Sequence, residues 1–270
     1  MPQLGLGVFQ VPPEETARIA SEALAAGYRS IDTAAAYMNE SGVGEAIARS
    51  GLDRDELFVT TKLPNTDHGH DKALSRFEES LRQLGLDYVD LYLIHWPVPA
   101  YDLYGETWRA LIEIAASRRA RAIGVSNFNV EHLERIIDET GVAPAVNQVE
   151  LHPGFNQSEL RKMHAQHDIV TESYSPLAQA DPRVIGHPAV VAAAESHGKS
   201  AAQVILRWHI QLGCVVIPKA SSAQRLAENI DVFDFELSGA EVEAIDAIDV
   251  VGRIGGDPAT FVRQPEHAED

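Results

Sequence analysis

Four side chains of complementary chemistry stand where they could act on one substrate. Asp32, Lys62 and His95 each end a short apolar run, and Tyr37 follows Asp32 on the next connection. A buried carboxylate is costly unless it is paired, so Asp32 needs a partner, which Lys62 can provide. A lysine kept protonated in this way would lower the pKa of the adjacent Tyr37 phenol from its unperturbed value of about 10. We therefore expect Tyr37 to act as a general acid.

A histidine beside these groups extends the chemistry to carbonyl compounds. One ring nitrogen of His95 can donate a hydrogen bond to a carbonyl oxygen and so polarise it. Such a set of side chains reduces carbonyls where a hydride is available. Each residue alone has a simpler interpretation, as a turn residue, a rim lysine, a packed tyrosine or a core histidine. Three successive runs that end in complementary ionisable groups favour one shared active site.

The elements that position these groups form a repeating pattern. Segments of helical periodicity separate short apolar runs, and the first segment starts at Pro13 and stops at Gly27. Eight strands alternating with helices predict an α/β protein with a (β/α)8 or TIM barrel, whose chemistry sits at the C-terminal ends of the strands. The expected strands are Leu4 to Phe9, Tyr28 to Thr33, Leu57 to Lys62, Val89 to His95, Arg121 to Ser126, Ala145 to Glu150, Ile169 to Ser173 and Cys214 to Lys219.

Two irregular segments interrupt this pattern without marking a domain boundary. The stretch "HWPVPAYDLYGE" is long, aromatic and proline-bearing, which is typical of a loop over a barrel mouth. Residues 251–270 show little periodicity and predict an irregular C-terminal tail. We expect residues 1–270 to form a single domain.

Composition limits the possible partners. A formal net charge of −18 argues against a nucleic-acid surface and against binding to anionic membranes, because both need clustered lysine and arginine. The single cysteine, Cys214, lies in an apolar run and is expected in the core, which suits a reducing compartment. No run is long enough to span a bilayer, and no targeting segment is evident. We expect a cytoplasmic monomer that acts on a small molecule.

Two common binding motifs are missing from the sequence. The early glycine pair has Gln10 where a dinucleotide fingerprint needs its third glycine, so a Rossmann fold is not expected. The histidines lack the spacing of a zinc site. We expect them in solvated regions and predict no metal: His68, His70, His164 and His167.

Seven motifs, in order and at characteristic spacing, extend over nearly the whole chain: "IDTAAAYMNE", "TTKL", "DLYLIHWP", "IGVSNF", "VNQVELHP", "ESYSPL" and "VVIPKA". In these the sequence resembles the aldo-keto reductase superfamily, and within it the bacterial 2,5-diketo-D-gluconate reductase branch. The resemblance implies a catalytic tetrad of Asp32, Tyr37, Lys62 and His95. It also implies NADPH bound across the barrel mouth. Relatives that reduce steroid double bonds carry glutamate in place of the histidine, so His95 favours carbonyl reduction.

The same resemblance assigns further residues to the cofactor and the substrate. Ser126, Asn127 and Gln148 would contact the nicotinamide carboxamide, and Tyr174 would stack on the ring. Ser175 and Leu177 would lie near the pyrophosphate. The 2′-phosphate and adenine contacts would be Lys219, Ala220, Ser221, Ser222, Arg225, Glu228 and Asn229. The substrate pocket would be formed by Phe9, Tyr37, His95, Trp96, the loop from Val98 to Tyr104 and the C-terminal tail.

Several positions depart from the family pattern. Relatives usually place serine directly after the clamp lysine and often arginine two positions further on, where this chain has Ala220 and Ser222. This difference predicts a weaker preference for NADPH. Pro64 and Met38 also differ, at positions beside the substrate pocket. The family resemblance therefore does not extend to the identity of the physiological substrate.

The sequence supports one main function and two alternatives. The main one is reduction of aldehydes and ketones by NADPH, with keto-sugars such as 2,5-diketo-D-gluconate and dicarbonyls such as methylglyoxal as first candidates. Lys62 could instead form a Schiff base in a barrel aldolase, although a lysine paired with Asp32 stays protonated and is a poor nucleophile. A non-catalytic, NADPH-sensing interaction protein is the other alternative, which the intact tetrad argues against.

Overall fold

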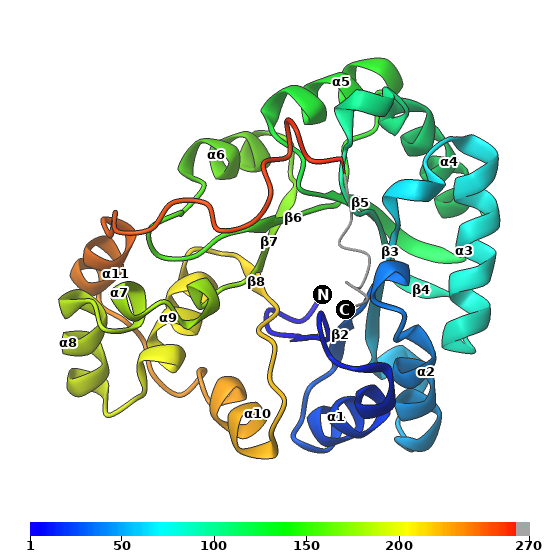
Figure 1. Cartoon of the computed structure of the whole chain (residues 1–270). Coiled ribbons are helices and arrows are strands. Elements are labelled where there is room, and N and C mark those ends of the chain that lie inside the picture. The colour runs from blue at the N-terminus through cyan, green and yellow to red at the C-terminus, as the bar shows by residue number, and fades with distance from the viewer. Residues whose placement is uncertain (263–270) are drawn as a thin grey trace, which may run out of the picture.

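Eight parallel strands follow one another around a barrel in the order of the sequence, and helices form a ring outside them (Figure 1). The computed structural model describes residues 1–262. The strands are β1 Leu6–Gly7, β2 Ser30–Asp32, β3 Phe58–Leu63, β4 Val89–Ile94, β5 Ala120–Ser126, β6 Val146–Glu150, β7 Val170–Tyr174 and β8 Val215–Val216. Each lies within or overlaps one of the eight predicted runs, so the predicted (β/α)8 fold is confirmed.

The barrel closes between its first and last strands. Leu4 forms a parallel bridge with Val216, and the backbone N–H of Gly5 donates to the Val216 carbonyl at 2.9 Å. The regular part of β1 and of β8 is only two residues long. The predicted runs at this seam were therefore too long, because their outer residues make irregular backbone contacts.

The helices occupy the connections that the periodicity predicted. The first begins at Pro13, as expected for a proline in the first turn. The helices are α1 Pro13–Ala25, α2 Glu40–Arg49, α3 His70–Leu84, α4 Tyr104–Ala116, α5 Val130–Thr140, α6 Ser158–Gln166, α7 Pro182–Ile185, α8 Pro188–His197, α9 Ala201–Gln211, α10 Ala223–Ile230 and α11 Gly239–Asp246. Short 3-10 helices include η1 Ala35–Tyr37, η2 Arg54–Glu56, η3 Asn65–Asp67, η4 Pro99–Tyr101 and η5 Ala178–Ala180. Within the described residues, no helix is long and apolar enough to cross a membrane.

The alternation of side chains along β3 and β4 separates two apolar layers. Tyr92 packs on Phe77 of α3, with ring centroids 4.8 Å apart, so it faces the helices. Its neighbours Leu91 and Leu93 point the other way, into the barrel, where they cluster with Val146. The larger core lies between the strands and the surrounding helices, and it includes the buried Cys214 that the sequence predicted.

A group of charged and aromatic side chains joins the N-terminal ends of β3, β4 and β5. We call it the floor clamp: Asp90, Arg54, Arg121 and Tyr88. The buried Asp90 carboxylate lies 2.7 Å from a nitrogen of Arg54 and 3.0 Å from one of Arg121, and it also accepts from the Val59 N–H at 2.9 Å. Both guanidinium groups lie over the Tyr88 ring, at 4.1 and 4.3 Å from its centroid. This end of the barrel is thus joined by hydrogen-bonded charges.

The tail crosses the opposite end of the barrel without helix or strand. Residues 251–262 are irregular, as predicted, and residues 263–270 lie outside the described part. The buried Glu150 carboxylate accepts from the N–H groups of Ile254 and Gly255, at 2.6 and 2.7 Å. Further along, Phe261 stacks on Trp96 with ring centroids 4.0 Å apart. A Cβ atom at Gly255 would lie 2.7 Å from the Glu150 carboxylate, so a larger residue there would force the carboxylate or the tail to move.

Candidate active site

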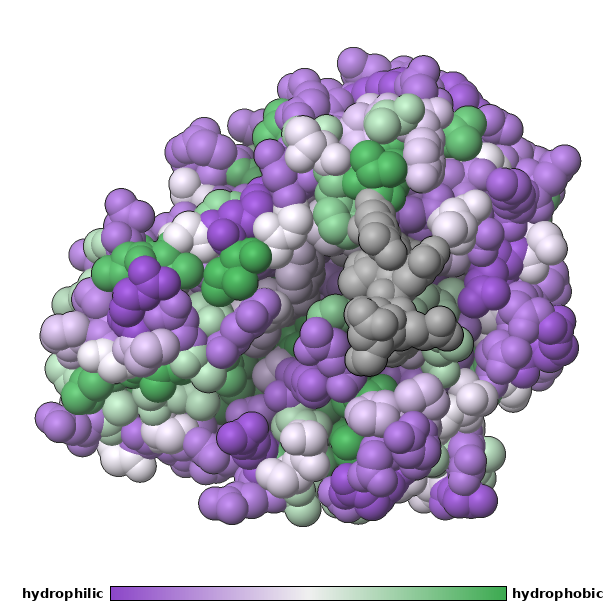
Figure 2. Space-filling model, viewed as in Figure 1, coloured by the Kyte–Doolittle hydropathy of each residue, from purple (hydrophilic) through white to green (hydrophobic). Residues whose placement is uncertain are grey.

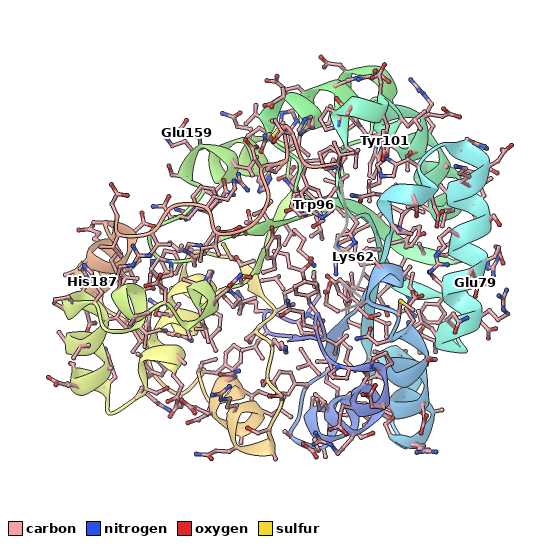
Figure 3. The ribbon with its side chains drawn as sticks, viewed as in Figure 1. Lys62, Glu79, Trp96, Tyr101, Glu159 and His187 are labelled. Carbon is pink, nitrogen blue, oxygen red and sulfur yellow. The ribbon has the colours of Figure 1, made fainter. Side chains whose placement is uncertain are left out.

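The four predicted catalytic side chains come together at the C-terminal ends of β2, β3 and β4. Lys62 donates to the Asp32 carboxylate at 2.5 Å, to the Thr33 carbonyl at 2.9 Å and to the Tyr37 hydroxyl at 3.3 Å. The Lys62 side chain is 0% exposed and that of Asp32 4% exposed. The expected partner of the buried carboxylate is therefore present, and Figure 3 shows Lys62 pointing toward the centre of the barrel.

Local structure brings Tyr37 back over this ion pair. The chain turns through η1 directly after β2, and Met38 ends the turn in the left-handed region with φ of 57°. The Tyr37 ring lies against His95 and Phe9, with centroid distances of 5.5 and 5.0 Å, and Lys62 Nζ is 4.9 Å from its centroid. The phenol thus stands between the buried lysine and the open mouth.

The charges of the site follow from burial and from these contacts. Burial lowers the pKa of Lys62, but the charge and hydrogen bond of Asp32, together with the nearby Tyr37 and Glu172, outweigh burial. The net shift is upward, and Lys62 stays protonated. Burial, together with the charge of Lys62, holds the pKa of His95 well below its ordinary value. The imidazole is therefore neutral near pH 7 and has one N–H to donate.

The structure corrects the expectation that the pKa of Tyr37 is low. Burial raises the pKa of the phenol, and the nearby charge of Lys62 offsets only part of that rise, so the net shift is upward rather than toward working pH. The residue types alone indicated the lysine but not the desolvation of the ring. In this arrangement Tyr37 carries its proton at neutral pH, and Lys62 makes loss of that proton less costly than burial alone would.

A second group of predicted residues surrounds the tetrad on β5, β6 and β7. The Asn127 amide donates to the His95 carbonyl at 3.0 Å, and the Tyr174 hydroxyl donates to the other end of the same amide at 2.8 Å. Ser126 donates to the backbone carbonyl of Gln148 at 2.9 Å. The four residues assigned to the nicotinamide therefore form one network with the tetrad.

One buried group of this network was missed by the sequence analysis. Glu172, in β7, is fully buried, and its carboxyl group accepts from the Gln148 amide at 2.8 Å. Burial, reinforced by the charge of Asp32, raises the pKa of Glu172 to about 8. An acidic residue inside the apolar run "IVTES" is the same signal that singled out Asp32, and it could have been used.

The predicted phosphate contacts lie at the loop between β8 and α10. Lys219 is exposed and donates to the Gln10 carbonyl at 3.1 Å, and Arg225 is exposed on α10. Within the described residues neither cation has an ion pair with a carboxylate, although the chain carries 40 acidic residues. Ser222 caps the helix by accepting from the Arg225 N–H at 3.4 Å. Two exposed cations beside a helix start are groups of the kind that bind phosphate.

The remaining predicted cofactor residues have varied surroundings. Ser175 and Leu177 follow β7, where Ser175 takes a φ of 49°. Glu228 accepts from the Ser200 hydroxyl at 2.5 Å, and Asn229 is buried on the same helix. Ala220 is buried and Ser221 exposed, so this loop presents its serine rather than its alanine to solvent.

Aromatic side chains line the mouth above the tetrad. Trp96 and Phe261 stack on each other, and Phe9 is 45% exposed. Seen from this side, the molecule has a recess at its centre and a mainly hydrophilic rim (Figure 2). The predicted loop is corrected at its end, because Tyr104 packs into the core on Phe128 at 5.6 Å.

The expected surroundings of the histidines outside the tetrad also need correction. His68 and His164 are buried rather than solvated, and burial lowers the pKa of each to about 4. His164 accepts or donates within a small network with Asn147 and Thr171, at 2.9 and 2.8 Å. Among residues 1–262, no group of three histidine, cysteine or carboxylate side chains could hold a metal ion.

The sequence also matches known proteins over nearly its whole length. A family model described as the aldo/keto reductase family matches residues 3–180 and 187–250. An aldo-keto reductase of Mycobacterium sp. (strain JLS) is 54% identical over 97% of this chain and 94% of its own length. The methylglyoxal reductase DkgA of Escherichia coli (strain K12) is 49% identical with the same coverage. A crystal structure of a Gox0644 mutant in complex with NADPH is 51% identical, covers 97% of this chain and 94% of its own, and has a TM-score of 0.92. The chain belongs to the aldo/keto reductase family.

Proposed function

We propose that this protein reduces aldehydes and ketones to alcohols with NADPH, and that Tyr37 donates the proton. It is an NADPH-dependent oxidoreductase of its family. The observation that carries the assignment of roles is the position of Lys62, whose amine contacts both the Asp32 carboxylate and the Tyr37 hydroxyl. A proton donor, a fixed cation and a neutral imidazole in one site suit a reaction in which negative charge develops on a carbonyl oxygen.

Each side chain of the tetrad has a distinct role in this mechanism. Bound NADPH supplies the hydride. Tyr37 gives its proton to the carbonyl oxygen, and the charge of Lys62 stabilises the phenolate that remains. Asp32 keeps Lys62 protonated and in place. His95, neutral because of its burial, donates a hydrogen bond that orients the carbonyl group.

Residues around the tetrad would hold the cofactor. Ser126, Asn127 and Gln148 offer amide and hydroxyl groups to a carboxamide, and Tyr174 offers an aromatic face to the ring. Lys219 and Arg225 would bind the 2′-phosphate by charge-assisted hydrogen bonds. The exposure of both cations and the lack of a carboxylate partner within residues 1–262 support this assignment.

Small dicarbonyls such as methylglyoxal, and keto-sugars such as 2,5-diketo-D-gluconate, are the substrates we favour. The name of the Escherichia coli relative DkgA supports the first of these. The aromatic mouth formed by Phe9, Trp96 and Phe261 suits short substrates with one reactive carbonyl at the tetrad. Loss of NADPH absorbance at 340 nm, followed with a panel of carbonyl compounds, identifies the preferred class.

The deciding experiment removes one hydroxyl. Tyr37→Phe should still bind NADPH, measured by quenching of protein fluorescence, while carbonyl reduction falls by about 10²–10⁴-fold. Tyr92→Phe is a matched control, because the Tyr92 hydroxyl is buried on the helix side of β4 and has no partner among the described residues. Near-wild-type turnover by Tyr37→Phe with several substrates would sink the mechanism.

The aldolase alternative is disfavoured by the state of Lys62. Its amine is protonated and donates three hydrogen bonds, so it is a poor nucleophile toward a carbonyl. Borohydride treatment in the presence of a carbonyl substrate should leave Lys62 unmodified. A covalent adduct on Lys62, detected by mass spectrometry, would reverse this conclusion. Turnover of any carbonyl by the purified protein would equally exclude a purely cofactor-sensing role.

A further inference from the structure

A second carboxyl group lies in the buried network, and the proposed mechanism does not use it. Glu172 stands in the middle of β7 with no exposed surface. Its Oε2 accepts from the Gln148 amide nitrogen at 2.8 Å, and its Oε1 is buried without a hydrogen-bond partner in the described residues. The same Gln148 nitrogen donates to the Asp32 carboxylate, also at 2.8 Å. One amide therefore bridges two carboxyl groups.

Near Glu172 lie a second acid, Asp32, and one cation, Lys62. Asp32 faces it from β2 and Lys62 from β3, with the Tyr37 phenol beyond the lysine. On either side in the sheet stand Gln148 of β6 and the apolar Val215 of β8. Lys62 is committed to Asp32 at 2.5 Å. A second ionised carboxylate in this place has no cation of its own, so it favours its neutral form.

We propose that Glu172 is a positioning residue of the active site, which fixes the Gln148 amide and adds a proton-dependent charge beside Asp32 and Lys62. The inference rests on the proposed reductase function and deepens it. Glu172 does not touch the reacting atoms, so its effects act through Gln148 and through the Lys62–Tyr37 pair.

The first effect concerns the direction of the Gln148 amide. The Asp32 carboxylate only accepts hydrogen bonds, and a neutral Glu172 still accepts through its carbonyl oxygen, so the Gln148 amide nitrogen faces both groups. The amide oxygen is then left to accept from the carboxamide of the cofactor. If the acceptor on β7 is lost, the amide keeps one of its two partners and can turn. Cofactor affinity should therefore depend on an acceptor at position 172.

The second effect concerns the proton of Tyr37. While Glu172 is neutral, Lys62 balances Asp32 and stabilises the phenolate that forms in the reaction. When Glu172 ionises, an added negative charge opposes formation of that phenolate. Since burial raises the pKa of Glu172 to about 8, carbonyl reduction should slow as the pH rises through that value. The expected change is on the order of tenfold, the effect of one charge in a partly screened interior.

The test compares two substitutions of Glu172 with one of Glu40. Glu172→Gln keeps an acceptor for Gln148 but cannot ionise, whereas Glu172→Leu removes the acceptor as well. Glu40→Gln is the matched control, because Glu40 is also buried, also has a raised pKa, and accepts from Thr61 at 2.6 Å on the helix side of β3. For each variant, kcat for carbonyl reduction is measured from pH 6 to 9, and NADPH affinity by fluorescence quenching.

The proposal predicts a different result for each of these variants. Relative to wild type, the kcat of Glu172→Gln should gain about tenfold between pH 6 and 9, with NADPH affinity unchanged, while Glu172→Leu should bind NADPH more weakly. Glu40→Gln should follow the wild-type profile. The charge effect would be overturned if Glu172→Gln and wild type had identical pH profiles of kcat, or if Glu40→Gln changed the profile equally. The positioning effect would be overturned if Glu172→Leu bound NADPH with wild-type affinity. If wild type reduces no carbonyl, the proposed function itself fails, which is a different result.

Discussion

Replacing Lys62 with methionine tests the buried ion pair most directly. The substitution keeps an unbranched apolar chain of similar length but removes the amine that donates to Asp32, Thr33 and Tyr37. The Asp32 carboxylate, whose side chain is 4% exposed, is then left without its cation. Breaking a buried pair in this way typically costs about 3–5 kcal/mol, because one charge remains buried and uncompensated.

The free-energy cost of leaving Asp32 without its cation has an upper limit, and this limit depends on pH. Asp32 can avoid the unpaired charge by taking up a proton in the folded variant. From an ordinary aspartate pKa of about 3.9, neutralisation at pH 7 costs about 4 kcal/mol relative to the unfolded chain, and at pH 5 about 1.5 kcal/mol. The unfolded variant binds fewer protons than the folded one over this range, so the stability of the variant falls as the pH rises. The loss relative to wild type should therefore grow from pH 5 to pH 7.

Urea unfolding followed by circular dichroism at pH 5, 6 and 7 measures this loss. Lys162→Met is the matched control, because Lys162 is 69% exposed in its pair with Glu159 and should contribute about 1 kcal/mol or less. The double variant Asp32→Asn, Lys62→Met should recover most of the stability at pH 7, because no charge is left to bury. A loss below about 1 kcal/mol at pH 7, or a loss that does not change with pH, would contradict the reasoning.

Two further predictions concern the cofactor and the tail. Lys219→Ala should weaken NADPH binding by about 1–3 kcal/mol in calorimetric titrations and leave NADH almost unaffected, whereas equal losses for both cofactors would argue against a 2′-phosphate contact. Gly255→Ala should displace the tail, since its Cβ would lie 2.7 Å from the Glu150 carboxylate, and so should separate Phe261 from Trp96. Acrylamide should then quench tryptophan fluorescence more strongly, because Trp108 and Trp208 are fully buried and only Trp96 would become more exposed. Unaltered quenching would show that the tail stays in place.

The barrel could be predicted from the sequence because the signals that indicate its strands are local. Each strand is an apolar run that a short segment of sequence reveals, and Asp32, Lys62 and His95 were found because each ends such a run. The rule that chemistry gathers at the C-terminal ends of barrel strands then placed them together. The distances, with Lys62 within 3.3 Å of both Asp32 and Tyr37, agree with that placement.

What could not be predicted depends on burial and on distant contacts. The direction of the Tyr37 pKa shift depends on how completely the ring is desolvated, which residue types do not reveal. His68 lies in a polar stretch of sequence yet is buried by the surrounding fold. Glu150 meets the tail across 104 residues of chain, and no local pattern marks such a contact. Glu172 is a different case, since its place in an apolar run was readable and was overlooked.

The floor clamp bears on how such a barrel can change over evolutionary time. Arg54, Asp90 and Arg121 join three strands at the end away from the tetrad, so these contacts do not involve the residues around the mouth. Mutations that reshape the mouth can therefore accumulate while the scaffold beneath them persists. A lineage built on this plan can inherit one reaction and diversify the molecules on which it is performed, because the parts that preserve the fold and the parts that choose the substrate are subject to selection separately.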